Sequence, residues 1–273
     1  MEHAEGLIDA GAKILEGVCH AGRPLRRIAV FAPHPDDEVI GAFSILSDST
    51  LERFVIFVTD GAPLKLGEDG MKLRRVRRDE SDEVAAFLGI LPNHLHRLGI
   101  PDQETVFQLP ELIHQVSRLI SEVAPEAVLI PSYEGGHPDH DSTAFAVHQA
   151  VQRLGEDRPR LFEMCLYHDR NGSMETRAFL SESGEAAPMV VNLSESQRLL
   201  KQEAFRFYRS QREVLSYFQT ESERFRVARD YDFRSAPHSG TLFYERFDWN
   251  VDGARWRALA GEAITEHRAG NAS

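Results

Sequence analysis

Continuous apolar runs alternate with segments of helical spacing, and this alternation constrains the fold more than any other feature of the chain. The runs are IAVFAP (28–33), FVIFVT (54–59) and AVLIPS (127–132). Uninterrupted apolar runs are typical of strands covered on both faces. The helix-like segments are 38–48, 72–90, 109–124 and 141–154. Because strand and helix alternate, we expect an α/β fold with a doubly wound, mostly parallel sheet and helices on both faces.

The pattern weakens after residue 170, where a long loop is expected. The remaining predicted elements are a helix at 7–18, strands at 162–168 and 189–194, a long helix at 195–219 and a terminal helix at 252–267. No linker rich in Pro, Gly or Ser divides the chain. We therefore expect a single domain over residues 1–273, with a core at 26–170 and an embellished C-terminal third, 171–273, that shapes the pocket.

Charge and cysteine content exclude several classes of protein. The net charge of −12 argues against a nucleic-acid or anionic-membrane surface, since such binding depends on clustered Lys and Arg. No stretch is apolar enough to span a bilayer, and the N-terminus lacks the features of a signal peptide. Cys19 and Cys165 form no CxxC pair, which excludes a thiolate zinc site. A cytoplasmic protein is expected.

The segment HPDDE follows directly after the first apolar run and places His34, Asp36, Asp37 and Glu38 at the end of a predicted strand. Burying these groups costs free energy unless a positive partner meets them. Ligands of open α/β sheets bind outside the carboxyl ends of the strands. One such cluster could equally be a turn followed by a helix cap, with Glu38 as a first-turn acid.

A second cluster, EGGHPDHDST (134–143), follows the run at 127–132 in the same topological way. Its polar members include His137, Asp139, His140 and Asp141. Two clusters at equivalent strand ends make a functional site the stronger interpretation. We expect the two loops to face each other across a crevice.

Together the loops offer the donors of a catalytic metal site. His34 and Asp37 from the first loop, with one His from the second, supply two imidazoles and a carboxylate, which suit zinc and leave a position open. Asp36 then remains free to act as a base. One bound divalent cation is the expected positive partner.

The stretches PHPDDEVIG (33–41) and GGHPDHD (135–141) resemble the motifs of the PIG-L or LmbE-like family of zinc-dependent N-deacetylases. The resemblance extends in motif order over about residues 26 to 220. Shorter matches are VTDG (58–61), Arg77 with Glu80, LGI (88–90), LGIPD (98–102) and a late SQ (210–211). These enzymes act mainly on N-acetylglucosaminyl conjugates, so the resemblance implies a Rossmann-like fold and removal of an acetyl group.

Carried over by position, the resemblance assigns roles to individual residues. It implies His34, Asp37 and His140 as metal ligands and Asp36 as the general base. It implies that His137 stabilises the oxyanion or protonates the leaving amine. Arg77 and Asp102 match positions that contact substrate hydroxyls in sugar-processing relatives. The implied metal is zinc, with iron or another divalent ion as the alternative.

Two departures from the family pattern concern the pocket. Some relatives carry a Tyr as oxyanion donor where this chain has Gly135, and Tyr133 is a nearby substitute. Tyr208 stands where relatives often have a His before the late SQ.

The expected activity is hydrolysis of an N-acetylated amino sugar or glycoconjugate, a small-molecule substrate. The alternatives are a metal-dependent phosphoesterase, since Asp and His clusters also serve two-metal sites, and a non-catalytic metal- or sugar-binding module. The intact Asp36 counts against the binding module.

Overall fold

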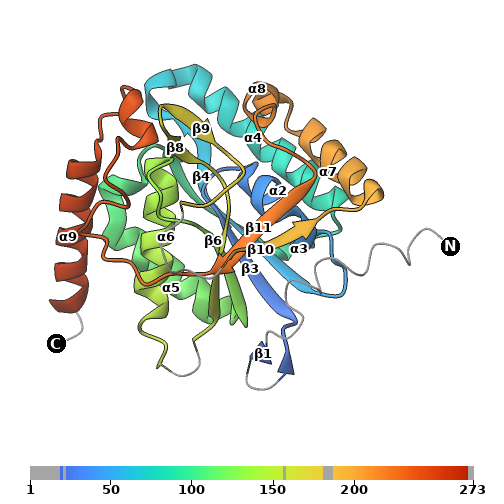
Figure 1. Ribbon diagram of the computed structural model, residues 1–273, viewed down its shortest axis with the longest axis horizontal. Coiled ribbons are helices and arrows are strands. Elements are labelled where there is room, and N and C mark those ends of the chain that lie inside the picture. The colour runs from blue at the N-terminus through green and yellow to red at the C-terminus, as the bar shows by residue number, and fades with distance from the viewer. Residues whose placement is uncertain (1–18, 21–22, 156–157, 181–186, 270–273) are drawn as a thin grey trace.

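The described residues of the computed structural model are 19–20, 23–155, 158–180 and 187–269. The helix expected at 7–18 therefore lies outside the described residues. A seven-stranded sheet forms the centre of the molecule, with helices packed on both of its faces (Figure 1).

The sheet has the strand order β10-β11-β7-β6-β3-β4-β5. Its strands are β3 (Arg27–Ala32), β4 (Glu52–Pro63), β5 (Leu95–Asp102), β6 (Ala127–Pro131), β7 (Arg160–Met164), β10 (Met189–Asn192) and β11 (Ser222–Val227). The five strands from β3 to β7 are parallel, while β11 pairs antiparallel with β7 and β10 antiparallel with β11. The expected α/β class with a mostly parallel sheet is confirmed.

Each face of the sheet is covered by its own set of helices. On one face lie α2 (Asp37–Gly41), α3 (Phe43–Leu46), α4 (Gly67–Phe87), α7 (Glu195–Phe207) and α8 (Arg212–Leu215). On the other lie α5 (Leu109–Val123), α6 (Pro138–Val151) and α9 (Gly253–Ala269) (Figure 1). Alternate residues of β3 serve the two cores: Ile28 and Val30 pack into the first, and Ala29 and Phe31 into the second. Burial on both faces explains why the strand reads as one apolar run.

The chain changes direction across the sheet between β3 and β6. From β3 it proceeds through β4 to β5 at one edge, and then returns to place β6 on the other side of β3. Ile28 of β3 is paired with Ala127 of β6 in parallel register. Loops that follow two such strands diverge and leave a crevice, which is where open α/β sheets bind ligands. The two His- and Asp-rich loops follow these two strands.

Several elements differ from the expected ones. The helix expected at 38–48 is broken at Ala42, and the one expected at 195–219 ends at Phe207. The capping box at the start of α7 is formed by Ser194 and Gln197. Strand β11 was not expected. Smaller elements are β1 (Cys19–His20), β2 (Arg23–Pro24), β8 (His168–Arg170), β9 (Ser173–Glu175), η1 (Leu64–Leu66), η2 (Pro92–His94), η3 (Thr105–Gln108), η5 (Arg209–Gln211) and η6 (Phe243–Arg246).

The length and hydropathy of the helices were compared with those of membrane-spanning helices. Within the described part of the chain, no helix has both the length and the apolar character needed to cross a bilayer.

Candidate metal centre and active site

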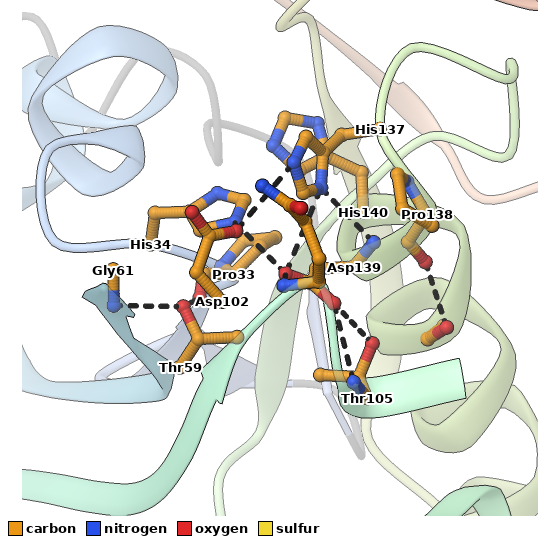
Figure 2. A network of polar contacts seen from close by, with 12 residues as sticks. Pro33, His34, Thr59, Gly61, Asp102, Thr105, His137, Pro138, Asp139 and His140 are labelled. Atoms are coloured by element: carbon orange, nitrogen blue, oxygen red, sulfur yellow. Dashed lines mark hydrogen bonds and ion pairs between the residues drawn. The ribbon is translucent and has the colours of Figure 1, made fainter. Parts of the chain in front are cut away.

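The two His- and Asp-rich loops meet beyond the carboxyl ends of β3 and β6. Figure 2 shows the imidazole rings of His34, His137 and His140 gathered in one place, with Asp102 approaching from the end of β5. The ring centroids of His34 and His137 are 4.5 Å apart, and those of His34 and His140 are 5.3 Å apart. The expectation that the two loops face each other is therefore confirmed.

Three side chains present donor atoms to one point. His34 Nδ1 lies 3.1 Å from Asp37 Oδ2, and His140 Nε2 lies 3.3 Å from the same oxygen. All three residues are buried, and their ligand atoms lie within 4.8 Å of one another. By geometry His140 Nε2 has no hydrogen-bond partner among the described residues. A buried nitrogen without a partner costs free energy, so this set fits a cation held between its members.

The other nitrogen of His34 faces two further carboxylates. Nε2 lies 3.1 Å from Asp139 Oδ2 and 3.2 Å from Asp102 Oδ1. Asp139 is fully buried and also accepts hydrogen bonds from the backbone N–H groups of Gln103, at 2.7 Å, and Thr105, at 3.3 Å. Figure 2 shows the contact with Thr105. Fixed in this way, Asp139 can hold the His34 ring in one orientation. A carboxylate on the far nitrogen is the usual partner of a metal-binding His.

His137 caps the N-terminus of α6, and this contact fixes its tautomer. The Asp139 N–H donates to His137 Nδ1 at 3.1 Å, so the neutral ring carries its proton on Nε2. Burial lowers the pKa of His137 well below its usual value, and the charge of His34 acts in the same direction. His137 Nε2, the atom with the proton, lies 3.6 Å from Asp102 Oδ1.

Asp36 lies beside the donor set with a strained backbone. Its φ of 132° is rare for a residue with a side chain, and such strain is found mainly at functional sites. The Asp36 N–H donates to Glu38 Oε2 at 2.9 Å, and Arg77 Nη2 lies 3.0 Å from Asp36 Oδ2. Burial raises the pKa of Asp36 to about 7, although Arg77 opposes the shift. A carboxyl group with this pKa can exchange protons near neutral pH.

Two hydrogen-bonded pairs near Asp36 give structural roles to Tyr208 and to the late SQ match. Tyr208 donates its hydroxyl proton to Glu38 Oε1 at 2.5 Å, and Glu38 in turn holds the Asp36 backbone. Ser210 of the late SQ match donates to Glu80 from its backbone N–H, at 2.9 Å, and from its hydroxyl, at 2.6 Å. This second pair ties α4 to η5 and is structural.

Arg77 lies within α4, inside the segment 72–90 that was expected to be helical. Its guanidinium donates to the carbonyl of Gly61, at 3.0 Å, and to that of Pro35, and it pairs with Asp36. The side chain thus braces the loops that follow β3 and β4. Asp102 is the last residue of β5, and it is partly exposed at the crevice.

Residues 29–151 match the family model described as PIG-L: GlcNAc-PI de-N-acetylase. The chain carries a PIG-L family domain. The match includes both His- and Asp-rich loops, Arg77 and Asp102, as the sequence resemblance implied.

Two bacterial relatives are similar to this chain over more residues than the PIG-L domain covers. A protein of Bacillus subtilis (strain 168) named "Probable N-acetyl-alpha-D-glucosaminyl L-malate deacetylase 2" is 28% identical over 185 residues, which cover 63% of this chain and 81% of its own. A protein of the same name from Bacillus cereus is 27% identical over 156 residues, covering 53% and 70%.

Solved structures share the fold of the PIG-L domain. The N,N'-diacetylchitobiose deacetylase from Pyrococcus horikoshii aligns with a TM-score of 0.55 at 20% identity, covering 74% of this chain and 84% of that one. A deacetylase from the teicoplanin biosynthesis pathway aligns with a TM-score of 0.57 at 16% identity, covering 75% and 100%. At these identities the likeness shows the fold.

Some residues near the centre were not assigned a role from the sequence. Asp139 belongs to the second loop of the PIG-L domain, but its contact with His34 depends on the tertiary fold. The Trp249 ring lies 4.6 Å from that of His137, and the Tyr167 ring 5.0 Å from that of His140. Both aromatic residues lie outside the matched range 29–151. No local motif marks either of them.

Tyr133, the substitute considered for the Tyr missing at Gly135, lies away from the centre. Its hydroxyl donates to the carbonyl of Ser235 at 2.9 Å, and its ring packs in the core against Phe233 and Trp256. His168 lies with its Nδ1 3.5 Å from Glu134 Oε2 and belongs to neither group of candidate ligands.

Proposed function

We propose that this chain is a zinc-dependent N-deacetylase that removes the acetyl group from an N-acetylated amino sugar or its glycoconjugate. One observation carries the proposal. Where the loops after β3 and β6 meet, two imidazoles and one carboxylate form a donor set, and a separate buried carboxylate, that of Asp36, lies beside it. Such a set leaves a position open, as metal-assisted hydrolysis requires. The PIG-L domain and the deacetylase names of its relatives support the same activity.

His34, Asp37 and His140 would hold the cation. Two imidazoles and a carboxylate suit zinc, with iron or another divalent ion as the alternative. When bound, the cation would supply Lewis acidity to the acetyl carbonyl and to the attacking water.

Asp139 and Asp102 also form, with His34 and His137, a second group that could hold a metal. This group is what a two-metal phosphoesterase would use. We assign Asp139 instead to orienting His34, because backbone N–H groups of Gln103 and Thr105 already occupy its oxygens. One cation per chain follows from this assignment.

In the proposed reaction, Asp36 accepts a proton from water as the water oxygen attacks the acetyl carbon. The C–N bond then breaks, Asp36 passes the proton to the departing nitrogen, and acetate and a free amine leave. Arg77 holds the Asp36 carboxylate through their contact at 3.0 Å. His137 is neutral and keeps its Nε2 proton, so it acts as a hydrogen-bond donor on the side of Asp102.

Selectivity for a sugar is assigned to Asp102, whose carboxylate can accept hydrogen bonds from ring hydroxyls. The sequence resemblance also suggested Arg77 for this task, but its contacts point to a role through Asp36. A site that pairs with hydroxyls discriminates against ligands that lack them, because its own polar groups stay unpaired.

The substrate class is tested by comparing acetate release from an N-acetylglucosaminyl conjugate, a simple acetamide and an acetyl-lysine peptide. The sugar is expected to be cleaved fastest. Asp102→Ala should lower kcat/KM on the sugar about 10- to 10²-fold more than on the peptide, as for loss of a hydrogen bond to a charged group. Any effect through the contact of Asp102 with His34 is common to both substrates. Arg77→Ala should lower all three rates by one common factor. Equal wild-type rates on sugar and peptide would exclude amino sugars as the preferred class.

We further propose that residues 1–273 form one domain in which 171–273 shapes the pocket. Strands β10 and β11 extend the central sheet, and Trp249 contacts His137, which supports this organisation. A cytoplasmic location is proposed from the sequence, since Cys165 is a free, buried thiol.

A further inference from the structure

Hydrolysis of an acetamide places negative charge on the acetyl oxygen, and hydrolases meet this charge with hydrogen-bond donors. Gly135 offers no side chain for the task, and the Tyr133 hydroxyl is committed to Ser235. His137 has a donor on Nε2, but Asp102 lies 3.6 Å away and competes for it. A donor from another element would share this charge with the cation that the site is proposed to hold.

Tyr167 follows β7, the strand on the other side of β6 from β3, and its ring contacts the candidate metal centre at His140. Its ring meets the His140 ring edge-on, with 5.0 Å between centroids and 65° between planes. The Phe243 ring lies 5.6 Å away on another side. A Cβ at Gly136 would lie 2.1 Å from the Tyr167 carbonyl oxygen and 3.2 Å from Cδ2 of its ring. The glycine in the second loop thus allows Tyr167 to approach this closely.

Near neutral pH a tyrosine side chain is ordinarily an uncharged phenol, which can donate a hydrogen bond. Because the Tyr167 ring meets that of His140 edge-on, the residue brings such a donor to the candidate metal centre.

This hydroxyl also differs from those of the other tyrosines in the interior. Tyr133 donates to Ser235 and Tyr208 to Glu38, while the hydroxyls of Tyr231 and Tyr244 contact Arg226 and Asp141. No described residue forms a hydrogen bond with the Tyr167 hydroxyl. Tyr167 is half-buried, so part of its side chain stays accessible beside the His140 ring.

We propose that Tyr167 is a further catalytic residue, whose hydroxyl donates a hydrogen bond to the acetyl oxygen as negative charge develops there. The inference rests on the proposed deacetylation. Tyr167 keeps its proton throughout: Asp36 takes the proton of the attacking water and returns it to the nitrogen when the C–N bond breaks. The hydrogen bond strengthens with charge on the oxygen, so it favours the transition state over the bound substrate.

The test compares Tyr167→Phe with Tyr133→Phe, a matched control that also loses one hydroxyl and keeps its ring. Zinc-loaded proteins are assayed on an N-acetylglucosaminyl conjugate, and inhibition is measured with its methylphosphonamidate analogue, whose tetrahedral anionic oxygen mimics the charged acetyl oxygen. Y167F should lower kcat about 10²- to 10³-fold with KM within about threefold of wild type, the loss expected for one oxyanion donor. Inhibitor affinity should fall by the same factor as kcat/KM, and Y133F should change neither.

The other outcomes would overturn the proposal. If Y167F releases acetate and binds the inhibitor as well as wild type and Y133F do, the role assigned to Tyr167 is wrong while the proposed function stands. Loss of zinc from Y167F in proportion to its lost activity would make Tyr167 a support for His140 and overturn the proposal. If the wild-type protein releases no acetate from any amino sugar, the proposed function itself fails, and the role of Tyr167 with it.

Discussion

Replacing Asp36 with Asn is expected to lower kcat about 10²- to 10⁴-fold, the range for loss of a general base. The substitution keeps the size of the side chain and its backbone N–H contact with Glu38. It removes the basic oxygen that would take the proton from water. Because Asp36 is outside the proposed ligand set, zinc content should stay at the wild-type level. Steady-state kinetics and elemental analysis of the same preparation measure both quantities.

Asp37→Asn is the matched control for this prediction, since it changes the neighbouring acid in the same way. Asp37 Oδ2 lies between His34 and His140, so this variant should lose zinc affinity as well as activity. The opposite pattern, in which D36N loses zinc and recovers activity with excess metal, would show that the two acids have exchanged roles.

Replacing Lys201 with Met is expected to lower the free energy of unfolding by about 3–5 kcal/mol, as for a buried charge that loses its partner. Lys201 Nζ lies 2.6 Å from Glu223 Oε1, and both side chains are 1% exposed. It also donates to the carbonyl of Ile40 in α2 at 2.8 Å. Met preserves the length of the side chain but leaves the charged Glu223 carboxylate buried without its positive partner. Urea unfolding followed by circular dichroism measures the change.

The exposed pair of Lys72 and Asp69 provides the control. Its Nζ to Oδ1 distance is 2.8 Å, but the side chains are 72% and 81% exposed. Surface pairs contribute little, so Lys72→Met should change stability by no more than about 1 kcal/mol. The double variant K201M/E223Q should recover part of the loss, because the second substitution replaces the unpaired carboxylate with a neutral amide. Equal effects of K201M and K72M would contradict the stabilising role assigned to the buried pair.

The parallel part of the fold could be predicted because its signals are local. Strands β3, β4 and β6 are buried on both faces and therefore appear as uninterrupted apolar runs. The two polar clusters follow β3 and β6 directly, so their meeting could be inferred from the position of strand ends in parallel sheets. No distance between residues was needed for that step.

The rest depends on contacts between distant residues. Strand β11 has the sequence SERFRV, whose charged residues do not form the apolar pattern of a buried strand. Glu223 can be buried in this strand because Lys201 neutralises its charge. The same carboxylate accepts the Ser44 N–H at 2.9 Å near the break at Ala42, where a continuous helix was expected. Helix α7 ends at Phe207, earlier than expected, and the next residue, Tyr208, donates a hydrogen bond to Glu38.

The site shows the same division between local and distant information. Motif positions identified His34, Asp36, Asp37, His137 and His140, and the structure brings them together. The contacts of Arg77 with two loop carbonyls, the hold of Asp139 on His34, and the approach of Tyr167 and Trp249 all join residues far apart in the sequence. No periodicity or spacing in a single chain encodes these contacts.

Titration of metal-stripped protein with zinc, with acetate release from an N-acetylglucosaminyl conjugate as the readout, tests the central claim most directly. Activity should rise from baseline and saturate at about one zinc per chain, as expected for a three-ligand catalytic site. His140→Ala should stay near baseline. His148→Ala, which removes another buried His of α6, should follow the wild-type curve. Acetate release that is independent of zinc, or saturation only at two zinc ions per chain, would contradict the account.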